Sequence, residues 1–480
     1  MRAAHRVAQI RVAEAVLRDQ LPAGALMQRA ATSLAIGCAR RLSGGVYGAR
    51  VVVLAGSGNN GADALWAGSQ LAARGAVVTA LLTGGAALDA MAALRAVGGH
   101  VGSAADLDAA DLVIDGLVGI GGSGPLRSPA AELAVEGEHV VAVDVPSGVD
   151  ADTGAVSGRA VRAGLTLTFG TGKPGLFVGA GRLHAGRVEI VDIGLGPFLP
   201  EPDVILLEGV DVAMRLPVRE TGGDKYSSGV VGIAAGSQQY TGAAVLATGA
   251  AIRAGAGMVR FAGVDHAAEQ VRARWPEAVV TRVEAGDGKA VVGVGRVQSW
   301  VVGPGIGTDD DAGSIVQAVL ATDVPVLVDA DALTLCAQHP AWLRDRAAPT
   351  LLTPHDREFE RFGTPIGDDR VAAVRRLAAD LGVTVLLKGD ATIVSDGERA
   401  LVNSTGSPLL ATAGTGDVLS GGCGALLAQG LDPLNAGAVG AFLHGVAGTL
   451  AADGAMTSAA ELLQRWPDAV RAARAGRLPS

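Results

Sequence analysis

Short runs of apolar residues, many of them β-branched, alternate with helical stretches along most of the chain, and this alternation constrains its fold more than any other feature. Each run ends in a turn rich in Gly, Pro, Asp or Asn. The runs are 51–55, 76–82, 111–115, 140–145 and 165–169 in the first half, and 230–235, 258–262, 300–302, 326–329, 350–353 and 383–387 in the second. Buried parallel strands read as continuous apolar runs and are joined by helices. The pattern therefore predicts an α/β fold, with right-handed βαβ units and parallel sheets covered by helices on both faces.

The alternation lapses between residues 194 and 224, where LGPFLPEPDV and LPVRETGGDK hold several Pro and Gly residues. Irregular stretches of this composition are typical of domain boundaries. A chain of 480 residues is also too long for one ordinary hydrophobic core. We therefore expect a domain over residues 1–205, a linker over 206–223 and a second domain over 224–480, each domain with three α/β/α layers.

Composition excludes several classes of function. The formal net charge of −9 argues against a general binder of nucleic acid or of anionic membranes, so anionic ligands must be held by backbone amides and a few Lys or Arg side chains. Cys38, Cys336 and Cys423 are far apart and odd in number, so they form neither a zinc motif nor a disulfide framework, and we expect a cytoplasmic location. No apolar run reaches the roughly 18 residues of a membrane span, and no secretory signal is recognisable.

The stretch 403–424 passes from small and polar residues through Gly414, Thr415, Gly416 and Asp417 into apolar residues at helical spacing. A glycine-rich turn before a helix presents unpaired N–H groups, and these can hold an anion such as a phosphate oxygen. A carboxylate beside that anion binds phosphate poorly, but it can take a proton from an attacking hydroxyl, as in phosphoryl transfer. The four residues alone are equally compatible with a plain turn in which Asp417 caps the helix.

The segment GSGNNG at 56–61 follows a predicted strand and precedes a predicted helix, so it matches the G-x-G-x-x-G dinucleotide fingerprint. That fingerprint needs an acidic residue about 20 positions further on for the ribose hydroxyls. Between Asp63 and Asp89 the chain has no Asp or Glu. We therefore expect a loop that holds phosphates without that ribose contact.

Polar residues follow four strands of the first half at their carboxyl ends, where open α/β sheets form their ligand crevice. These residues are Asn59, Asn60, Asp63, Asp115, Asp144, Ser147 and Lys173. Converging Asn, Asp and Ser oxygens suit a hard cation such as K⁺ or Mg²⁺. Each residue taken singly is better explained as a helix cap or turn former, but together they favour a site.

The first half contains GSGNNGAD at 56–63, DGLVGIG at 115–121, DVPSGVDADTG at 144–154 and LTFGTGKPG at 167–175. These motifs resemble the series of the NAD(P)HX epimerase family, whose members interconvert the two epimers of hydrated NADH or NADPH. The resemblance covers about residues 1–200 and implies a Rossmann-like domain. The chain departs from the usual NNGGDG at Ala62 and Ala64, which puts methyl groups where positive φ or close backbone approach is expected.

The epimerase resemblance implies roles for individual residues. The substrate's phosphates would lie against Asn59, Asn60, Gly61, Ala62 and Asp63, and against Gly119, Ile120, Gly121, Gly122, Ser123, Gly124 and Pro125. K⁺ would be bound by Asn60, Asp115 and Ser147. Asp144 would contact the nicotinamide end and transfer the proton.

From residue 224 onward the chain contains, in order, DKYSSG, GSQQYTGAAVL, GAGMV, GPGIG, DADAL, LTPHDREF, LKGDAT and ATAGTGDVLSGG. This series resembles the ADP- or ATP-dependent NAD(P)HX dehydratases, which have a ribokinase-like fold. The two resemblances together imply a bifunctional repair enzyme whose small-molecule substrates are hydrated NADH or NADPH and ADP. The departures are Arg357, where the family usually has Gly, and Ala413 in place of the first Gly of GGTGD. No role is assigned to Asp329 and Asp331, which lie at a predicted strand end.

The dehydratase resemblance places the nucleotide on Lys388, Gly389, Asp390, Ala391 and Thr392, and the phosphoryl group in transit on Gly414, Thr415 and Gly416. It makes Asp417 the base for the hydroxyl of the hydrate, and Mg²⁺ would accompany ADP while keeping water and phosphate ligands. Ala244 and Gly307 would line the pocket of the hydrate, and His355 would contact it. His355 is equally explained as a histidine satisfied by its own turn.

Two other functions remain compatible with these residues. One is a ribokinase-like small-molecule kinase fused to a non-catalytic phosphate-binding domain, and the other is an N-terminal domain that serves only as a partner surface. We expect a homo-oligomer, for which the apolar segment 434–450 could supply an interface, and neither a nucleic acid nor a membrane as partner.

Overall fold

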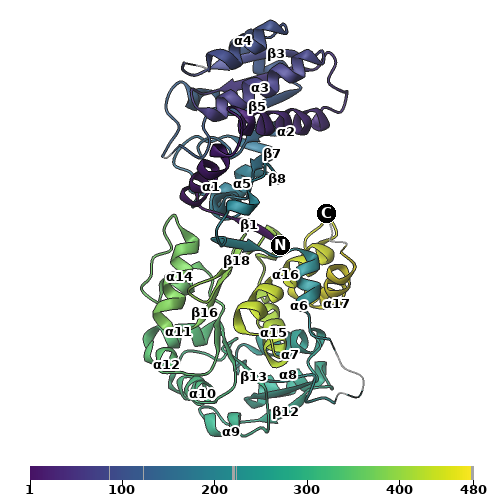
Figure 1. Ribbon diagram of the computed structural model, residues 1–480. Helices are drawn as coiled ribbons and strands as arrows, with labels where there is room; N and C mark the ends of the chain where they lie inside the picture. The colour runs from purple at the N-terminus through teal and green to yellow at the C-terminus, as the bar shows by residue number, and fades with distance from the viewer. Residues whose placement is uncertain (86, 123, 219–221, 223, 477–480) are drawn as a thin grey trace. The chain divides into compact units, whose positions relative to one another are not determined.

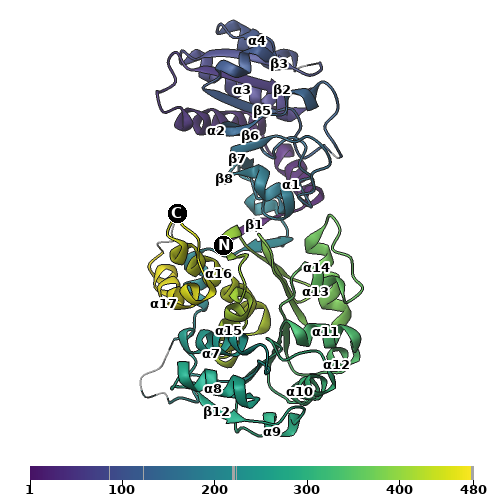
Figure 2. The ribbon, with the colours of Figure 1, turned by 180° about the vertical axis from the view of Figure 1, so that it is seen from behind.

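The computed structural model describes residues 1–85, 87–122, 124–218, 222 and 224–476 (Figure 1). The chain forms two compact units, one of Ala3–Val204 and one of Met1–Arg2 with Ile205–Ser480. Within each unit helices flank a β-sheet, as Figures 1 and 2 show. The predicted α/β fold is therefore confirmed.

The sheet of the N-terminal unit has seven parallel strands in the order β4-β3-β2-β5-β6-β7-β8. The strands are β2 (Arg50–Ala55), β3 (Val77–Leu82), β4 (His100–Val101), β5 (Leu112–Gly116), β6 (Glu136–Val143), β7 (Arg162–Phe169) and β8 (Arg187–Val191). The helices are α1 (Val7–Asp19), α2 (Ala25–Arg41), α3 (Asn59–Ala73), α4 (Leu88–Ala96) and α5 (Gly179–Ala185).

Both faces of this sheet are buried. Val51 and Val53 of β2 belong to one apolar cluster, which includes residues of α2 and α3, while Val52 and Leu54 belong to another. The second cluster is closed by shorter segments, among them the 3-10 turns η1 (Ala104–Ala109) and η2 (Ala130–Leu133). Burial on both faces explains why these strands read as unbroken apolar runs.

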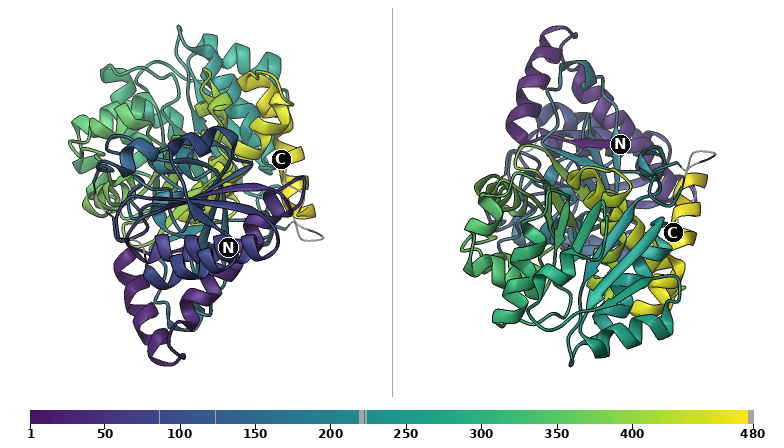
Figure 3. Two further views of the ribbon diagram at one scale, coloured as in Figure 1. Left: turned by 90° about the horizontal axis from the view of Figure 1, so that it is seen from above. Right: turned by 90° about the horizontal axis from the view of Figure 1, so that it is seen from below.

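The second sheet has eleven strands in the order β1-β9-β18-β17-β16-β15-β14-β13-β10-β11-β12. The strands are β1 (Arg2–Ala4), β9 (Val204–Leu206), β10 (Val230–Ala234), β11 (Met258–Gly263), β12 (Val279–Arg282), β13 (Ser299–Val302), β14 (Val326–Val328), β15 (Thr350–Leu352), β16 (Thr384–Leu387), β17 (Thr392–Ser395) and β18 (Ala400–Asn403). The helices are α6 (Gly209–Arg215), α7 (Thr241–Arg253), α8 (Asp265–Arg274), α9 (Gly288–Val292), α10 (Asp310–Leu320), α11 (Asp331–Gln338), α12 (Ala341–Arg344), α13 (Asp356–Glu360), α14 (Arg370–Leu381), α15 (Thr415–Ala428), α16 (Pro433–Ala452) and α17 (Ala459–Ala475). In the view from below, the yellow C-terminal helices lie beside the teal strands of this sheet (Figure 3).

Strand β17 is antiparallel to both its neighbours, β16 and β18, so the expectation of a wholly parallel sheet is wrong here. Only a few residues separate β16, β17 and β18, and such short connections join antiparallel strands, because a parallel pair needs a long crossover. Asp396 fixes the second turn by accepting hydrogen bonds from the N–H groups of Glu398 (3.1 Å) and Arg399 (2.8 Å). A search for strands separated by helices could not find this hairpin.

The predicted linker, 206–223, is largely part of the C-terminal unit. Leu206 ends β9 and pairs with Val402 of β18, and α6 follows directly. Val212 on α6 is fully buried in the apolar core of this unit, together with Leu216. The linker prediction is therefore wrong for this part, because a strand and a helix of only a few residues follow a Pro-rich stretch and leave no clear periodicity in the sequence. Residues 219–221 and 223 lie outside the described residues.

Helix α16 is a core helix rather than an exposed interface. It is long and apolar enough to cross a membrane by length and composition, but 78% of its most apolar window is buried inside the structure. It is apolar on all sides, as expected for a helix surrounded by protein. The expectation that 434–450 supplies an oligomer interface is therefore wrong, since that surface is already covered.

Gly421 lets α15 and α7 pack backbone to backbone. A Cβ atom at this position would lie 2.1 Å from the carbonyl oxygen of Ala247. We expect Gly421→Ala to lower the free energy of unfolding by about 2 kcal/mol, because overpacking forces the helices apart. Gly313→Ala in α10, where no atom lies within 4 Å of the Cβ position, should instead stabilise by up to about 1 kcal/mol. Urea unfolding measures both, and equal stability of the two variants would contradict this packing.

Candidate functional site

Helix α15 begins at a glycine turn that leaves backbone N–H groups unpaired. Gly414, the residue before the helix, has a φ of 88°, a left-handed conformation that glycine adopts without steric cost. In the described part of the chain, the N–H groups of Gly416 and Asp417 have no backbone acceptor. They lie at the positive end of the helix dipole, so this turn, 414–417, can hold an anion. We call it the anion cradle.

Asp417 lies within the first turn of α15 and does not cap the helix. The residue at the cap position is Gly414, and no side chain makes the capping hydrogen bond. The alternative interpretation of Asp417 as a plain helix cap is therefore wrong. Its carboxyl instead faces the charges of Asp329, Lys388 and Asp331.

Lys388 lies in a polar cluster beside the anion cradle. Its Nζ is 2.9 Å from Asp329 Oδ1 and 3.8 Å from Glu358 Oε2. The Ser420 hydroxyl on α15 donates to the other oxygen of Asp329 at 2.6 Å. A Cβ atom at Gly416 would lie 3.5 Å from Nζ, so the ammonium borders the cradle. Because Asp329 is only 1% exposed and Ser420 is fully buried, the cluster fixes the position of Lys388.

Burial and the charge of the cluster set the protonation of Asp417. Burial, with the nearby charge of Asp329, raises the pKa of Asp417 to about 7, although the Lys388 ammonium opposes this shift. Burial alone would lower the pKa of Lys388, but Asp329 and Glu358 outweigh it and raise that pKa, so the ammonium stays charged. A carboxyl that titrates near neutrality beside a fixed cation can act as a general base.

This electrostatic arrangement predicts the pH dependence of any reaction that uses Asp417 as a base. Only the ionised carboxylate accepts a proton, so kcat/KM should fall about tenfold per pH unit below the raised pKa, which is about 7, and level off above it. A pH series of initial rates measures this. A profile that stays flat down to pH values near the ordinary carboxyl pKa would show that Asp417 is not the base.

Residues 388–392 form the turn between β16 and β17, at the carboxyl end of β16. The middle of the turn, Gly389 and Asp390, is exposed, while Ala391 and Thr392 are buried. A Cβ atom at Gly389 would lie 3.5 Å from an Nη atom of Arg370 on α14, whose guanidinium is paired with the Asp356 carboxylate. The structure thus brings Lys388 to the cradle and leaves an exposed backbone turn next to it.

His355 is satisfied by its own turn, the alternative that the sequence left open. It is the N-cap residue of α13, and its Nδ1 accepts hydrogen bonds from the N–H groups of Arg357 (3.1 Å) and Glu358 (3.3 Å). In return the Glu358 carboxylate accepts from the His355 N–H at 2.8 Å. This capping box aims Glu358 at Lys388. The His355 side chain is half exposed, so contact with a ligand through Nε2 stays a prediction.

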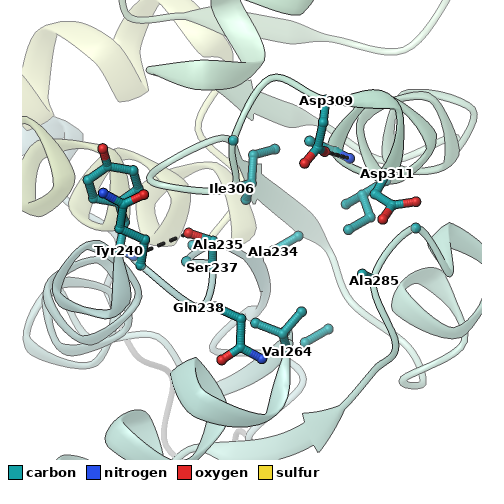
Figure 4. Close-up of a pocket in the computed structure, with 18 residues that line it drawn as sticks. Ala234, Ala235, Ser237, Gln238, Tyr240, Val264, Ala285, Ile306, Asp309 and Asp311 are labelled. Atoms are coloured by element: carbon teal, nitrogen blue, oxygen red, sulfur yellow. Dashed lines mark hydrogen bonds between the residues drawn. The ribbon is translucent and has the colours of Figure 1, made fainter.

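A cavity of about 340 Å³ lies at the carboxyl ends of β10, β11 and β13 (Figure 4). Small and apolar residues line much of it, with polar groups from Ser237, Gln238, Gln239, Tyr240, Asp309 and Asp311. Gly307 lies in its wall and donates its N–H to Asp331 Oδ2 at 2.9 Å. The Asp331 carboxylate thus accepts a hydrogen bond from the wall of the cavity, and its charge is also one of those that raise the pKa of Asp417.

Ala244, which we expected beside Gly307, does not line this cavity. Its side chain is fully buried in the apolar core on α7, where a Cβ atom at Gly236 would lie 2.9 Å from the Ala244 methyl group. Its small side chain allows the loop after β10 to approach α7 closely, and contact of Ala244 with the hydrate stays a prediction.

In the N-terminal unit, Asp144 follows β6 with a φ of 67°, which is unusual for a residue other than glycine. Its Oδ1 accepts hydrogen bonds from the Thr168 hydroxyl and the Phe169 N–H, both at 3.1 Å, and from Lys173 Nζ. Lys173 is 1% exposed and also donates to the Thr168 hydroxyl at 2.9 Å. A charged carboxylate held in a strained turn by a buried cation is more typical of an active site than of a stabilising contact.

Asp115 and Ser147, two of the three predicted K⁺ ligands, contact each other. The Ser147 N–H donates to Asp115 Oδ2 at 2.8 Å, and the Ser147 hydroxyl donates to Oδ1 at 2.6 Å. Burial raises the pKa of Asp115 to about 6, although these hydrogen bonds oppose the shift. Asn60 is near, since a Cβ atom at Gly116 would lie 2.9 Å from the backbone carbonyl oxygen of Asn60, whose side-chain amide donates to the Val143 carbonyl at 2.9 Å. The structure therefore brings the three residues together.

Asp63 lies three residues after Asn60 on α3. Burial, followed by the charges of Asp144 and Glu14, raises the pKa of Asp63 to about 8. One of its carboxyl oxygens is buried and has no hydrogen-bond partner in the described structure. Glu14 of α1, which the sequence analysis missed, also has a raised pKa, from burial and from Asp144. A protonated Asp63 would not repel a phosphate.

The other predicted phosphate contacts lie at the start of α3 and in the loop after β5. Asn59 and Gly61 are in the first turn of α3. The loop contains Gly119, Ile120, Gly121, Gly122, Gly124 and Pro125, while Ser123 lies outside the described residues. A Cβ atom at Gly121 would lie 3.6 Å from an Nη atom of Arg11, which brings a positive charge to the loop.

Ala62 and Ala64 fit the structure without strain. Both lie inside α3 and neither has a positive φ. Ala62 is 4% exposed, and the fully buried Ala64 faces Gly116, whose missing side chain leaves it room. The expectation that their methyl groups crowd the turn is therefore wrong. The close approach is at Gly61, where a Cβ atom would lie 2.1 Å from the Gly56 carbonyl oxygen.

The fold and the two sites define the class of protein: a two-unit α/β protein with an anion cradle and a candidate base in the C-terminal unit and a buried carboxylate site in the N-terminal unit. Residues 231–467 match the family model described as NAD(P)H-hydrate dehydratase, and residues 23–175 match that of the YjeF-related protein N-terminus. The chain belongs to the family of bifunctional NAD(P)H-hydrate repair enzymes, with an epimerase domain and a dehydratase domain. The alternative of a small-molecule kinase fused to a non-catalytic domain is not supported.

Relatives and solved structures agree with this assignment. The chain is 50% identical over 410 residues, 82% of each chain, to the bifunctional NAD(P)H-hydrate repair enzyme Nnr of Mycobacterium tuberculosis, and 49% identical over the same shares to that of Mycobacterium leprae. An ADP/ATP-dependent NAD(P)H-hydrate dehydratase from Bacillus subtilis, co-crystallised with ATP and Mg²⁺, is 28% identical with a TM-score of 0.50, covering 55% of this chain and 97% of that one. A ribokinase-like superfamily protein from Enterococcus faecalis is 28% identical with a TM-score of 0.52, covering 58% and 99%.

Proposed function

We propose that the dehydratase domain uses ADP to restore NADH and NADPH from their hydrates, releasing AMP and phosphate. The observation that carries the proposal is the position of Asp417, a largely buried carboxyl at the unpaired amides of the anion cradle with Lys388 beside it. A base, an anion site and a fixed positive charge are the parts that phosphoryl transfer requires. The exposed turn at 389–390 would hold the nucleotide, and the cavity at Gly307 would take an uncharged part of the hydrate.

The chemistry follows from these positions. Asp417 takes the proton from the hydroxyl of the hydrate while that hydroxyl's oxygen attacks the terminal phosphorus of ADP. AMP then leaves with the electrons of the broken P–O bond. The amides of the cradle and the Lys388 ammonium stabilise the charge on the phosphoryl oxygens. Phosphate then leaves the ring with the electrons of the C–O bond, a proton leaves the neighbouring carbon, and the double bond of the dihydronicotinamide forms.

Mg²⁺ fits this site as a companion of the nucleotide. No group of three or more His, Cys, Asp or Glu side chains that could hold a metal ion was found among the described residues. Asp329 and Glu358, which already face the Lys388 ammonium, would hold the ion directly or through water. When bound, Mg²⁺ neutralises charge on the phosphates.

We further propose that the epimerase domain binds K⁺ at Asn60, Asp115 and Ser147 and uses Asp144 for proton transfer. The hydrogen bonds of Asp115 come from uncharged groups among the described residues, so a monovalent cation suits its buried charge. That cation would supply positive charge near the substrate. The amides at the start of α3 and the glycine loop beside Arg11 would hold the diphosphate.

A turnover assay with separated epimers tests the main proposal. Hydrated NADH or NADPH is mixed with the purified chain, Mg²⁺ and either ADP or ATP, and the return of reduced-nicotinamide absorbance is followed. We expect turnover with ADP and the release of one AMP and one phosphate per NADH formed. Nucleotide consumption with a stably phosphorylated product would contradict the dehydratase mechanism.

Exchange of the monovalent cation tests the K⁺ site. Replacing K⁺ by tetramethylammonium should slow epimer exchange by the wild type about tenfold or more, because the charge of Asp115 loses its counter-ion. Asp115→Asn should be slow in both salts. Chromatographic separation of the epimers over time measures the rate. Equal wild-type rates in both salts would overturn the assignment.

We also propose a cytoplasmic location. Cys38, Cys336 and Cys423 are buried thiols without a disulfide partner, as expected in a reducing compartment.

A further inference from the structure

His444 on α16 contacts the first turn of α15, behind the anion cradle. Its Nε2 lies 2.9 Å from the carbonyl oxygen of Thr415, and the residue is 7% exposed. A carbonyl oxygen can only accept, so Nε2 carries the proton and donates it. Burial lowers the pKa of His444 to about 4, although the hydrogen bond to Thr415 opposes the shift, so the ring is neutral at physiological pH.

The hydrogen bond acts on a peptide group that forms part of the cradle. The carbonyl of Thr415 and the N–H of Gly416 belong to one planar peptide unit. In a helix these two groups point in opposite directions along the axis, so the N–H faces the anion site while the carbonyl faces away from it. A donor on the carbonyl fixes the plane of this peptide and polarises its N–H, because linked hydrogen bonds strengthen one another.

Helix α16 also anchors the loop that precedes the cradle. The Asn403 side-chain amide donates to the carbonyl of Ala441 at 2.9 Å, and the Thr405 hydroxyl donates to that of Phe442 at 3.0 Å. These two contacts hold the loop after β18, whereas His444 reaches a peptide of the cradle itself. One turn of a rigid core helix therefore supports both ends of the segment that would enclose the phosphoryl group.

We propose that His444 is a positioning residue for phosphoryl transfer: it orients and polarises the Thr415–Gly416 peptide so that its N–H stabilises the charge that develops on the phosphoryl oxygens. The inference rests on the proposed function of the dehydratase domain and adds to it a residue that acts through a peptide bond. The interaction strengthens in the transition state, so it changes kcat more than ADP binding.

The test compares His444→Leu, which removes the donor, with His444→Gln, whose amide nitrogen can take the place of Nε2. Ser299→Ala is the matched control, since the buried Ser299 hydroxyl donates to another α15 carbonyl, that of Gly424, at 2.8 Å and far from the cradle. In the full chain with ADP and Mg²⁺ we expect His444→Leu to lower kcat of dehydration about tenfold with the KM for ADP within about twofold. His444→Gln should recover to within about threefold of the wild type, and Ser299→Ala should keep the wild-type kcat.

The outcomes separate this inference from the proposed function. A wild-type chain without ADP-dependent turnover would overturn the function itself. Wild-type turnover with an unchanged kcat in His444→Leu would overturn the role of His444 alone. If His444→Leu and Ser299→Ala lost kcat equally and in proportion to their lost thermal stability, His444 would be a packing residue only. The same would follow if His444→Gln were as slow as His444→Leu. Epimerisation, measured in the same samples, should be unchanged in every variant.

Discussion

Asp417→Asn should abolish dehydration, with a loss of about 10³-fold or more in kcat, while ADP still binds. The amide is nearly isosteric with the carboxylate but cannot accept the proton of the hydroxyl. The groups that would hold the phosphates, the cradle amides and Lys388, are unchanged by the substitution. The Kd for ADP should therefore stay within about threefold, or tighten, because an ionised carboxyl next to phosphate is removed. Absorbance assays and calorimetric titration with ADP measure the two effects.

Asp432→Asn is the matched control for this substitution. Asp432 is the exposed N-cap of α16 and accepts a hydrogen bond from the N–H of Asn435 at 3.0 Å. Asparagine is an equally good cap, so this variant should keep its turnover and stability. Turnover by Asp417→Asn within tenfold of the wild type would reject Asp417 as the base. Loss of both turnover and ADP binding would instead assign Asp417 to the binding of the nucleotide.

The architecture was largely predictable because a strand that is buried on both faces consists of consecutive apolar residues, which can be recognised in the sequence. Strands β2, β5 and β10 follow that rule. The elements that were missed are short or unusual in context: the β17–β18 hairpin has no helix between its strands, and α6 follows a Pro-rich stretch. Their formation depends on pairing partners and core contacts that no local pattern records.

Some residues of the candidate dehydratase site could be predicted from the sequence, and others could not. Asp417 and Lys388 stood out because each lies in a glycine-containing motif next to a predicted strand or helix end. Asp329 was left without a role, although the structure places it between Lys388, 59 residues away, and Ser420, 91 residues away. Sequence spacing carries no information about contacts of that range. The turn itself held the only signal, two aspartates around Ala330, whose φ of 50° is strained for alanine.

Asp144→Asn should reduce epimerisation about 10²-fold or more and leave dehydration of the reactive epimer unchanged. Asparagine tolerates the positive φ of this position, so the turn survives, but the amide cannot transfer a proton. The substitution also leaves the buried Lys173 ammonium without its counter-ion, so the N-terminal unit should lose a few kcal/mol of stability. Dehydratase turnover in the same sample shows whether the rest of the chain is folded and active.

Two further variants separate the chemistry of Asp144 from the stability of its surroundings. Lys173→Met removes the cation but keeps the carboxylate, so the N-terminal unit should lose stability while epimerase activity persists. Asp150→Asn is the matched control: Asp150 Oδ1 accepts hydrogen bonds from the N–H groups of Asp152 (3.0 Å) and Thr153 (2.8 Å) in a neighbouring turn, and it should keep its epimerase rate. If Asp144→Asn retained epimerase activity within threefold, proton transfer would have to be assigned elsewhere. The carboxyl of Asp63 would then be the group to examine, because burial and the charge of Asp144 raise its pKa to about 8.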